Sequence, residues 1–462
     1  MSAGDTFHTN VLIQTEIELL VPKVRTLALI LPVFPKNNPL ENNEVDLLVI
    51  TKEAFSLRLD GNFKLNGSDL RELDFSVSEN NIAGTNKAAA FQFSLRPYLL
   101  TLLAQYYDPN FLNAGLEFSI DQGLILDRTS GQPHGSQGSI QLQYPLDSQQ
   151  TSWGYQFNFD YLYTPRFVMD KDRVKEKYQW LKINGHAGMT RSFGGNSKNN
   201  LTWGYGFSYQ KPTLLSEEFK KTVLPVKEFQ SFLSINYDYF WNYFDPLHNY
   251  NTFVLQEWIP LGPKISLSND FGVKFLFSDE NFWHPQFNLS FTFSPILDSL
   301  MQLSLESETR WQSQFVNSQI KTKVLLVSPQ LFGIGRLLLN GVYGKKWNDL
   351  NKSPFTLGGN LLRGLVPDYY SGTNVINTNV EFRSISLPVG AFRLGGVLFY
   401  DFGAAFDEDT YFQFSHALGI GARIFYLPFS RSVFRIDMGV PAAGPKSGLK
   451  NTVISFGVDQ AF

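Results

Sequence analysis

Apolar and polar residues alternate one by one along most of this chain, and the alternation is clearest near the C-terminus. In residues 375–383, one set of alternate positions is mainly apolar: Ile376, Thr378, Val380 and Phe382. The intervening positions are polar or charged: Asn377, Asn379, Glu381 and Arg383. A period of two is typical of a β-strand with two different faces. The same pattern over 392–403, 414–425 and 433–440 predicts three further strands.

Such segments recur from about residue 55 to the C-terminus without a helical interlude, which is too many for an ordinary β-sandwich. Their second face mixes Gly, Asn, Asp, Glu and Arg, as a polar lumen would. We therefore predict an all-β fold, an antiparallel transmembrane β-barrel over residues 54–462, with soluble β-structure as the alternative. Scanning for alternation gives about twenty candidate strands. The charged stretch 165–177 is predicted to be a loop.

Residues 1–53 differ from the rest of the chain. A short helix is expected over 15–25 and two strands over 26–32 and 44–51, which makes a small α+β module. The first residues lack the basic start and apolar core of a secretory signal peptide. For an outer-membrane protein, this implies that a native leader has been removed or replaced.

Composition supports a barrel and narrows the chemistry. The 462 residues include 42 Phe and 20 Tyr, which suits the aromatic girdles of a membrane barrel, and no stretch is apolar enough for a membrane helix. The lack of cysteine excludes disulfides and thiolate chemistry. A net charge of −3 gives no nucleic-acid footprint.

A glycine-rich segment with a single arginine is the most informative local motif. It lies in the turn-rich region 354–372, ahead of five strand-like segments, and contains Gly358, Gly359, Leu362, Arg363, Gly364 and Leu365. Glycines allow close approach of backbone, and a lone arginine there offers a planar donor fork to a carboxylate. A solvated turn with one surface arginine is the alternative.

At three places the chain resembles the outer-membrane assembly and secretion superfamily that includes BamA-like insertases and TpsB-like secretion pores. Residues 45–49 followed by Glu53 resemble the last strand of a POTRA domain, and residues 78–86 and 107–111 resemble the first hairpins of the barrel. The third place is an ordered series of motifs: 358–365, 379–382, 399–403, 434–437 and the terminal Phe462, which resembles a C-terminal barrel signal.

The resemblance implies a barrel of sixteen strands or more, with a partial POTRA-like periplasmic module at 1–53. Its arginine loop, here about 346–373, would follow the eleventh strand, fold into the lumen and leave five strands. Arg363 would be the loop-tip arginine, Asp401 its partner and Glu381 a second candidate partner. Both carboxylates fall on the polar face of their strands by the alternation alone.

The sequence departs from the family pattern in several ways. An aromatic residue usually follows the Arg-Gly pair, but this chain has Leu365. The C-terminal signal normally has a hydrophobic residue two positions before the final Phe, but here it is Gln460. The strand candidates before the loop also exceed eleven, and the POTRA-like region is too short for a full module.

By resemblance we expect a bacterial outer-membrane protein that inserts β-barrel proteins through a seam between its first and last strands, near 55–65 and 452–462. Its partners would be the lipid bilayer, unfolded clients, and accessory lipoproteins or periplasmic subunits. A TpsB-like secretion pore and a structural barrel or porin are the alternatives.

No enzyme activity, metal or cofactor is expected. The six histidines are scattered without ligand spacing, and no nucleophile elbow or P-loop occurs.

Overall fold

The computed structural model describes most of the chain. The described residues are 26–33, 46–53, 56–67, 69–146, 151–170, 173–195, 197–214, 225–241, 243–253, 256–408, 413–426, 433–444, 447–458 and 460. Phe462, which the sequence marks as a barrel signal, lies outside them, as does the helix expected over 15–25.

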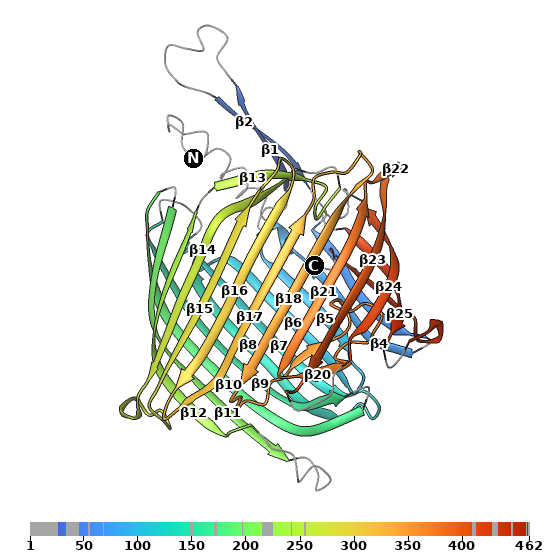
Figure 1. Ribbon diagram of the computed structural model, residues 1–462. Helices are drawn as coiled ribbons and strands as arrows, with labels where there is room; N and C mark the ends of the chain where they lie inside the picture. Colours follow the sequence, from blue (N-terminus) through green and yellow to red (C-terminus); the bar gives the residue numbers. More distant parts are fainter. Residues whose placement is uncertain are drawn as a thin grey trace.

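Among these residues, twenty strands form the ring of a closed antiparallel barrel (Figure 1). The first ten are β3 (Leu57–Asn66), β4 (Asp69–Glu79), β5 (Ala88–Leu95), β6 (Leu99–Phe111), β7 (Leu116–Asp127), β8 (Pro133–Tyr144), β9 (Trp153–Asp170), β10 (Arg173–Phe193), β11 (Ser197–Leu214) and β12 (Glu228–Trp241). The others are β14 (Gln256–Gly272), β15 (Phe282–Phe293), β16 (Leu300–Trp311), β17 (Phe315–Val327), β18 (Gly335–Trp347), β21 (Asn374–Ser384), β23 (Phe392–Phe406), β24 (Ser415–Phe425), β25 (Phe434–Ala443) and β26 (Val453–Val458). Short strands β13 (Tyr243–His248) and β22 (Leu387–Val389) pair with the ends of β14 and β23.

The strand count corrects the expectation taken from the family. Sixteen strands were expected, but the described ring has twenty: fifteen before the arginine loop and five after it. The alternation predicted about twenty strands. This count agrees with the described ring because nearly every alternating segment forms part of the wall. The charged stretch 165–177 is not a loop either, because β9 and β10 continue through it and pair as far as Arg173 opposite Asp170.

The wall has the two faces that the alternation predicts. Large apolar side chains stay exposed on the outside of strands all around the ring, among them Phe75, Ile120, Leu233, Leu398 and Ile420. A soluble protein rarely leaves such an extensive apolar surface uncovered, whereas a bilayer covers it. The intervening residues face inward; in β21 they are nearly all buried.

Outside the ring, β1 (Thr26–Val33) and β2 (Asp46–Glu53) form a separate two-stranded antiparallel sheet. These two strands match the pair expected near the N-terminus. Helical structure among the described residues is limited to short 3-10 turns at Ile82–Gly84, Lys274–Leu276 and Leu449–Asn451. None of the described helices is long and apolar enough to cross a membrane.

Strand direction defines two ends of the barrel. We call the end from which β3 starts the near end, and the opposite end the far end. Because neighbouring strands are antiparallel, β18 runs toward the far end and the arginine loop begins there, whereas β12 runs toward the near end. Figure 1 shows β13 and β20 at opposite ends accordingly.

Candidate functional site

The arginine loop connects β18 to β21 and folds against the inside of the wall. It contains a small hairpin of β19 (Phe355–Leu357) and β20 (Tyr370–Gly372). Its apolar residues form one buried cluster with inward-facing residues of the C-terminal strands: Leu357, Leu362, Leu365, Val366, Tyr369, Tyr370, Val375, Ala405, Ala417 and Val453. Leu365, the residue after the Arg-Gly pair, is therefore a core residue of the loop.

Glycines give the loop its shape. Gly358 and Gly359 have φ of +142° and +61°, conformations that L-residues with a side chain rarely adopt. Gly364 lies so close to the wall that a Cβ there would meet the Ala417 Cβ at 2.5 Å and the Pro441 nitrogen at 3.1 Å. On the wall, a Cβ at Gly439 would meet the Arg363 carbonyl oxygen at 2.5 Å. Both surfaces thus lack side chains where the loop tip touches β25.

Arg363 is 2% exposed, and its guanidinium faces two carboxylates that are fully buried. Its Nε and Nη2 donate to Asp401 Oδ2 and Oδ1, both at 2.8 Å, in a bidentate pair. Nη1 donates to Glu381 Oε2, and the Arg363 backbone nitrogen also donates to Asp401 Oδ2 at 3.1 Å. The structure therefore brings Arg363 together with both carboxylates that the sequence singled out.

The guanidinium remains charged in this buried position. Burial lowers the pKa of Arg363, but the hydrogen bond to Asp401 and the charges of Asp401, Glu381 and Asp437 outweigh burial and raise it above the usual value. Charge-assisted bidentate hydrogen bonds of this kind are short and directional. The site is consequently an ion cluster whose hydrogen bonds fix the position and the orientation of the Arg363 side chain.

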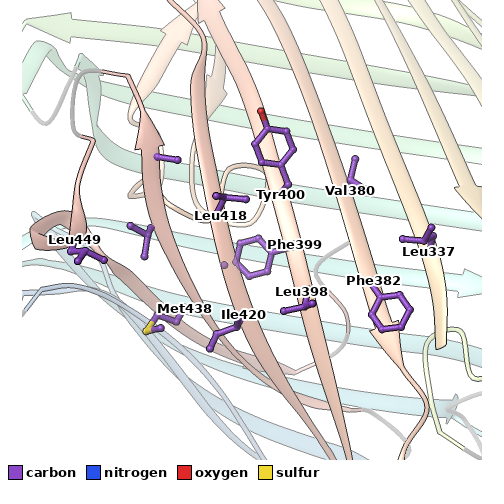
Figure 2. Close-up of a pocket in the computed structure, with 13 residues that line it drawn as sticks. Leu337, Val380, Phe382, Leu398, Phe399, Tyr400, Leu418, Ile420, Met438 and Leu449 are labelled. Atoms are coloured by element: carbon purple, nitrogen blue, oxygen red, sulfur yellow. The ribbon is translucent and has the colours of Figure 1, made fainter. Parts of the chain in front are cut away.

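An aromatic ring completes the Arg363 environment. The guanidinium carbon lies 3.5 Å from the centre of the Phe399 ring, a cation–π contact. The ring in turn covers Gly419, where a Cβ would collide with it. Phe399 also lines an apolar groove of about 600 Å³ with the outward-facing Leu398, Leu418, Ile420 and Met438 (Figure 2). One ring thus contacts the ion cluster and also lines this groove.

Four further charged residues surround the pair, and sequence reasoning did not assign them to the site. Arg383 Nε donates to Glu381 Oε1 at 2.6 Å, and Arg423 Nη1 donates to Asp437 Oδ1 at 2.6 Å. Arg435 reaches Asp437 at 3.3 Å and donates to loop residue Asn360 at 3.0 Å. The alternation had placed all four on the polar face, so inward charge on the last strands was the available signal.

The seam between the first and last strands is short. β26 pairs with β3 over four residue pairs, from Val453 opposite Asn66 to Phe456 opposite Phe63, compared with six between β25 and β26. Among the described residues, it is the shortest ladder in the ring. Val453 at this seam also belongs to the buried cluster of the arginine loop, so the loop packs against the last strand.

Comparisons with known proteins give distant structural likenesses. No protein-family profile matches the sequence, and no curated protein matches it. Among solved structures, BamA from Haemophilus ducreyi lacking POTRA domains 1–3 is 11% identical, with 100% of this chain and 80% of that chain covered and a TM-score of 0.40. CdiB from Acinetobacter baumannii is 13% identical (99% and 69% covered, TM-score 0.44). CdiB from Escherichia coli is 11% identical (99% and 72% covered, TM-score 0.46). All three TM-scores are below 0.5.

Proposed function

We propose that this chain is a bacterial outer-membrane protein that inserts β-barrel proteins into the membrane through the seam between β3 and β26, with the Arg363 loop as a lock on the inner wall. The short seam carries the proposal. Among the described residues, Leu57–Asn62 of β3 pairs with β4 but has no recorded partner on β26. Unpaired N–H and C=O groups at a strand edge are a template for an incoming strand.

In this proposal the lock holds the last strands in place while the seam exchanges partners. Arg363 binds Glu381 of β21 and Asp401 of β23. The apolar residues of the loop also pack against Val453 of β26. Removing one member of a buried ion pair leaves a charge without compensation, so the lock resists partial opening. The partners are the lipid bilayer, unfolded barrel clients, and accessory lipoproteins or periplasmic subunits. No catalytic step is assigned to the chain.

A disulfide across the seam tests the proposal. Leu65 and Ile454 lie opposite each other on the outward face, within the separation that a disulfide can bridge. With both replaced by cysteine, we expect oxidation to abolish insertion of a client barrel into vesicles and reduction to restore it. The matched control is the outward-facing pair Ile120 and Ile140 in the middle of the wall, whose disulfide should leave insertion unchanged.

A secretion pore is the second candidate, favoured by the width of the ring. The diameter of a barrel grows with strand number, and twenty strands enclose room for a passing chain beside the loop. If clients thread the lumen, the oxidised Leu65→Cys/Ile454→Cys protein keeps secreting. Full insertion activity of the oxidised protein contradicts the seam mechanism, and the absence of both activities in the unmodified chain indicates a structural barrel.

A further inference from the structure

A second loop folds into the barrel from the near end. We call residues Asn249–Phe253, which follow β13, the inner loop. It lies between β13 and β14, at the opposite end from the start of the arginine loop. Neither the alternation nor the family resemblance singled it out.

The carboxylate of Glu257 organises the inner loop. It accepts hydrogen bonds from the backbone N–H groups of Tyr250 at 3.2 Å, Asn251 at 2.8 Å and Thr252 at 2.8 Å. The Asn251 N–H also reaches the second carboxylate oxygen at 3.1 Å, and the Thr252 hydroxyl adds a fifth hydrogen bond at 3.0 Å. Three successive amides held by one carboxylate fix the backbone of this turn.

Apolar contacts fix the inner loop to the wall on two sides. Tyr250 packs in a buried cluster with Leu247 and with residues of β16, β17 and β18: Leu300, Val327 and Leu338. Phe253 is 4% exposed and packs against Phe425 of β24 and against Val433. The inner loop therefore bridges the middle strands and the C-terminal strands.

The inner loop also touches the ion cluster of the arginine loop. Arg383 Nη1 donates to the Tyr250 carbonyl at 3.0 Å, while its Nε donates to Glu381 Oε1. The other Glu381 oxygen, Oε2, accepts from Arg363. One buried carboxylate is thus shared between an arginine that holds the inner loop and the arginine at the tip of the far-end loop.

Gln460 makes a second connection, next to the seam. Its Oε1 accepts from Arg423 Nε at 2.9 Å, and its Nε2 donates to the Asn251 carbonyl at 3.4 Å. Gln460 follows β26 and stands where the barrel signal normally has a hydrophobic residue. In this chain, its amide links the inner loop to the arginines of the cluster.

We propose that the inner loop regulates the Arg363 lock: the two loops are coupled through Tyr250, Arg383, Glu381 and Arg363, so that releasing either loosens the other. The role of Arg363 as a lock rests on the proposed function, but the coupling does not. If Arg363 leaves, Arg383 turns to bind both oxygens of Glu381 and gives up the Tyr250 carbonyl. If the inner loop leaves, Arg383 is free to compete with Arg363 for Glu381. A partner acting at the near end would thereby reach a loop that starts at the far end.

Hydrogen exchange of the full chain in nanodiscs tests the coupling in both directions. Glu257→Gln weakens only the inner loop directly; we expect exchange at the arginine-loop amides of Arg363 and Leu365 to rise about tenfold, as for a tenfold shift in an opening equilibrium. Arg363→Gln should raise exchange at Tyr250, Asn251 and Thr252 by a similar factor. Retention of the unheated gel mobility shows that each variant is folded.

Two comparisons make the outcome decisive. Arg310→Gln breaks another buried pair, with Glu228 at 2.9 Å, which has no recorded contact with either loop among the described residues, and should leave both loops unchanged. In an Arg383→Gln/Gln460→Ala chain, adding Glu257→Gln should have no further effect at Arg363, because both connections between the inner loop and the ion cluster are already cut. The coupling is wrong if each variant loosens only its own loop. Exchange is read independently of insertion, so coupling can be found where the insertase proposal fails, and the reverse.

Discussion

At the scale of single residues, the site depends on one guanidinium with every side engaged. Asp401 takes two of its donors, Glu381 takes a third, and the Phe399 ring covers its face. Such an arrangement suits arginine and not lysine, because only arginine offers a planar fork that can pair bidentately and stack. The surrounding glycines make room for this geometry.

Replacing Arg363 should destabilise the barrel strongly. Arg363→Gln leaves Asp401 buried without its bidentate partner and removes one of the arginines that bind Glu381, which costs on the order of 3–5 kcal/mol. We expect the temperature at which the compact gel band converts to the unfolded band to fall clearly. Lys274→Gln is the control: its pair with Glu280 is more than half exposed, so the conversion temperature should hardly change. Equal effects of the two substitutions would contradict a buried lock.

Gly364 tests how tightly the loop tip meets the wall. Gly364→Ala should push the tip away from Ala417 and Pro441 and lower the conversion temperature, because the new Cβ has no space. Gly341→Ala in β18 is the matched control, since a Cβ there meets nothing within 4 Å. Limited proteolysis of the loop gives the second measurement. A Gly364→Ala loop as resistant as the parent would show that the tip is not closely packed.

The alternation predicts the inward face of these charges, and the family resemblance supplied the pairing of Arg363 with Asp401 and Glu381. The partners of Arg383, Arg423 and Arg435 were not predicted. Alternation puts Glu381, Asp401 and Asp437 on the inner face because a two-residue period has only two outcomes. Which arginine meets which carboxylate depends on register between strands and on loops, and neither is written in the local pattern. Gln460 shows the same limit. In the sequence it is only a departure from the C-terminal barrel motif, whereas in the folded chain its amide bonds Arg423 and the inner-loop carbonyl of Asn251.

At the scale of elements, the strands were predictable where a bilayer imposes two different faces. The stretch 165–177 was misread as a loop because charges on both faces disguise a strand. The ends of β9 and β10 are nonetheless paired, and their ladder continues through the charged residues. The length of the seam was not predictable, because it depends on the stagger of the closed ring.

Strengthening β3 should slow insertion. Gly61 weakens this strand, and a Cβ there meets only the Asp74 carbonyl oxygen, at 3.6 Å. Gly61→Val should stabilise the barrel by about 0.5–1 kcal/mol and reduce the insertion rate, measured with a client barrel and vesicles. Gly67→Val is a control with the opposite expected effect on stability. Because φ is +60° there, a side chain adds strain and should destabilise the barrel. A Gly61→Val protein that inserts faster would argue against the seam.

At the scale of the whole molecule, the arginine loop packs along one side of a ring of twenty described strands, and the diameter of a barrel grows with its strand number. The described loop packs on the C-terminal strands through a cluster of ten buried residues. The family expectation of sixteen strands would have implied a narrower and more easily closed lumen. In a barrel of twenty strands the arginine loop can brace the wall without plugging the pore, whereas in a narrower barrel the same loop would plug it.

Conductance in planar bilayers distinguishes the two. We expect Arg363→Gln to change the single-channel conductance by less than about twofold, because the buried apolar cluster still holds the loop to the wall. The Arg310→Gln protein supplies the baseline for loss of a buried ion pair elsewhere. A sharp rise with Arg363→Gln alone would instead identify the loop as a plug and favour the secretion pore.

The position of Phe399 has an electrical consequence. The Phe399 ring contacts the Arg363 guanidinium on one side and also lines the apolar groove. This groove is part of the surface that hydrocarbon chains would cover. While Arg363 is in place, its charge is paired with Asp401 and Glu381, which weakens the field across this layer. Once the loop leaves, Asp401 loses its bidentate partner, whereas Glu381 keeps Arg383. Water would then be drawn to the buried oxygens of Asp401, so loss of the arginine would change the hydration of the wall behind the Phe399 ring.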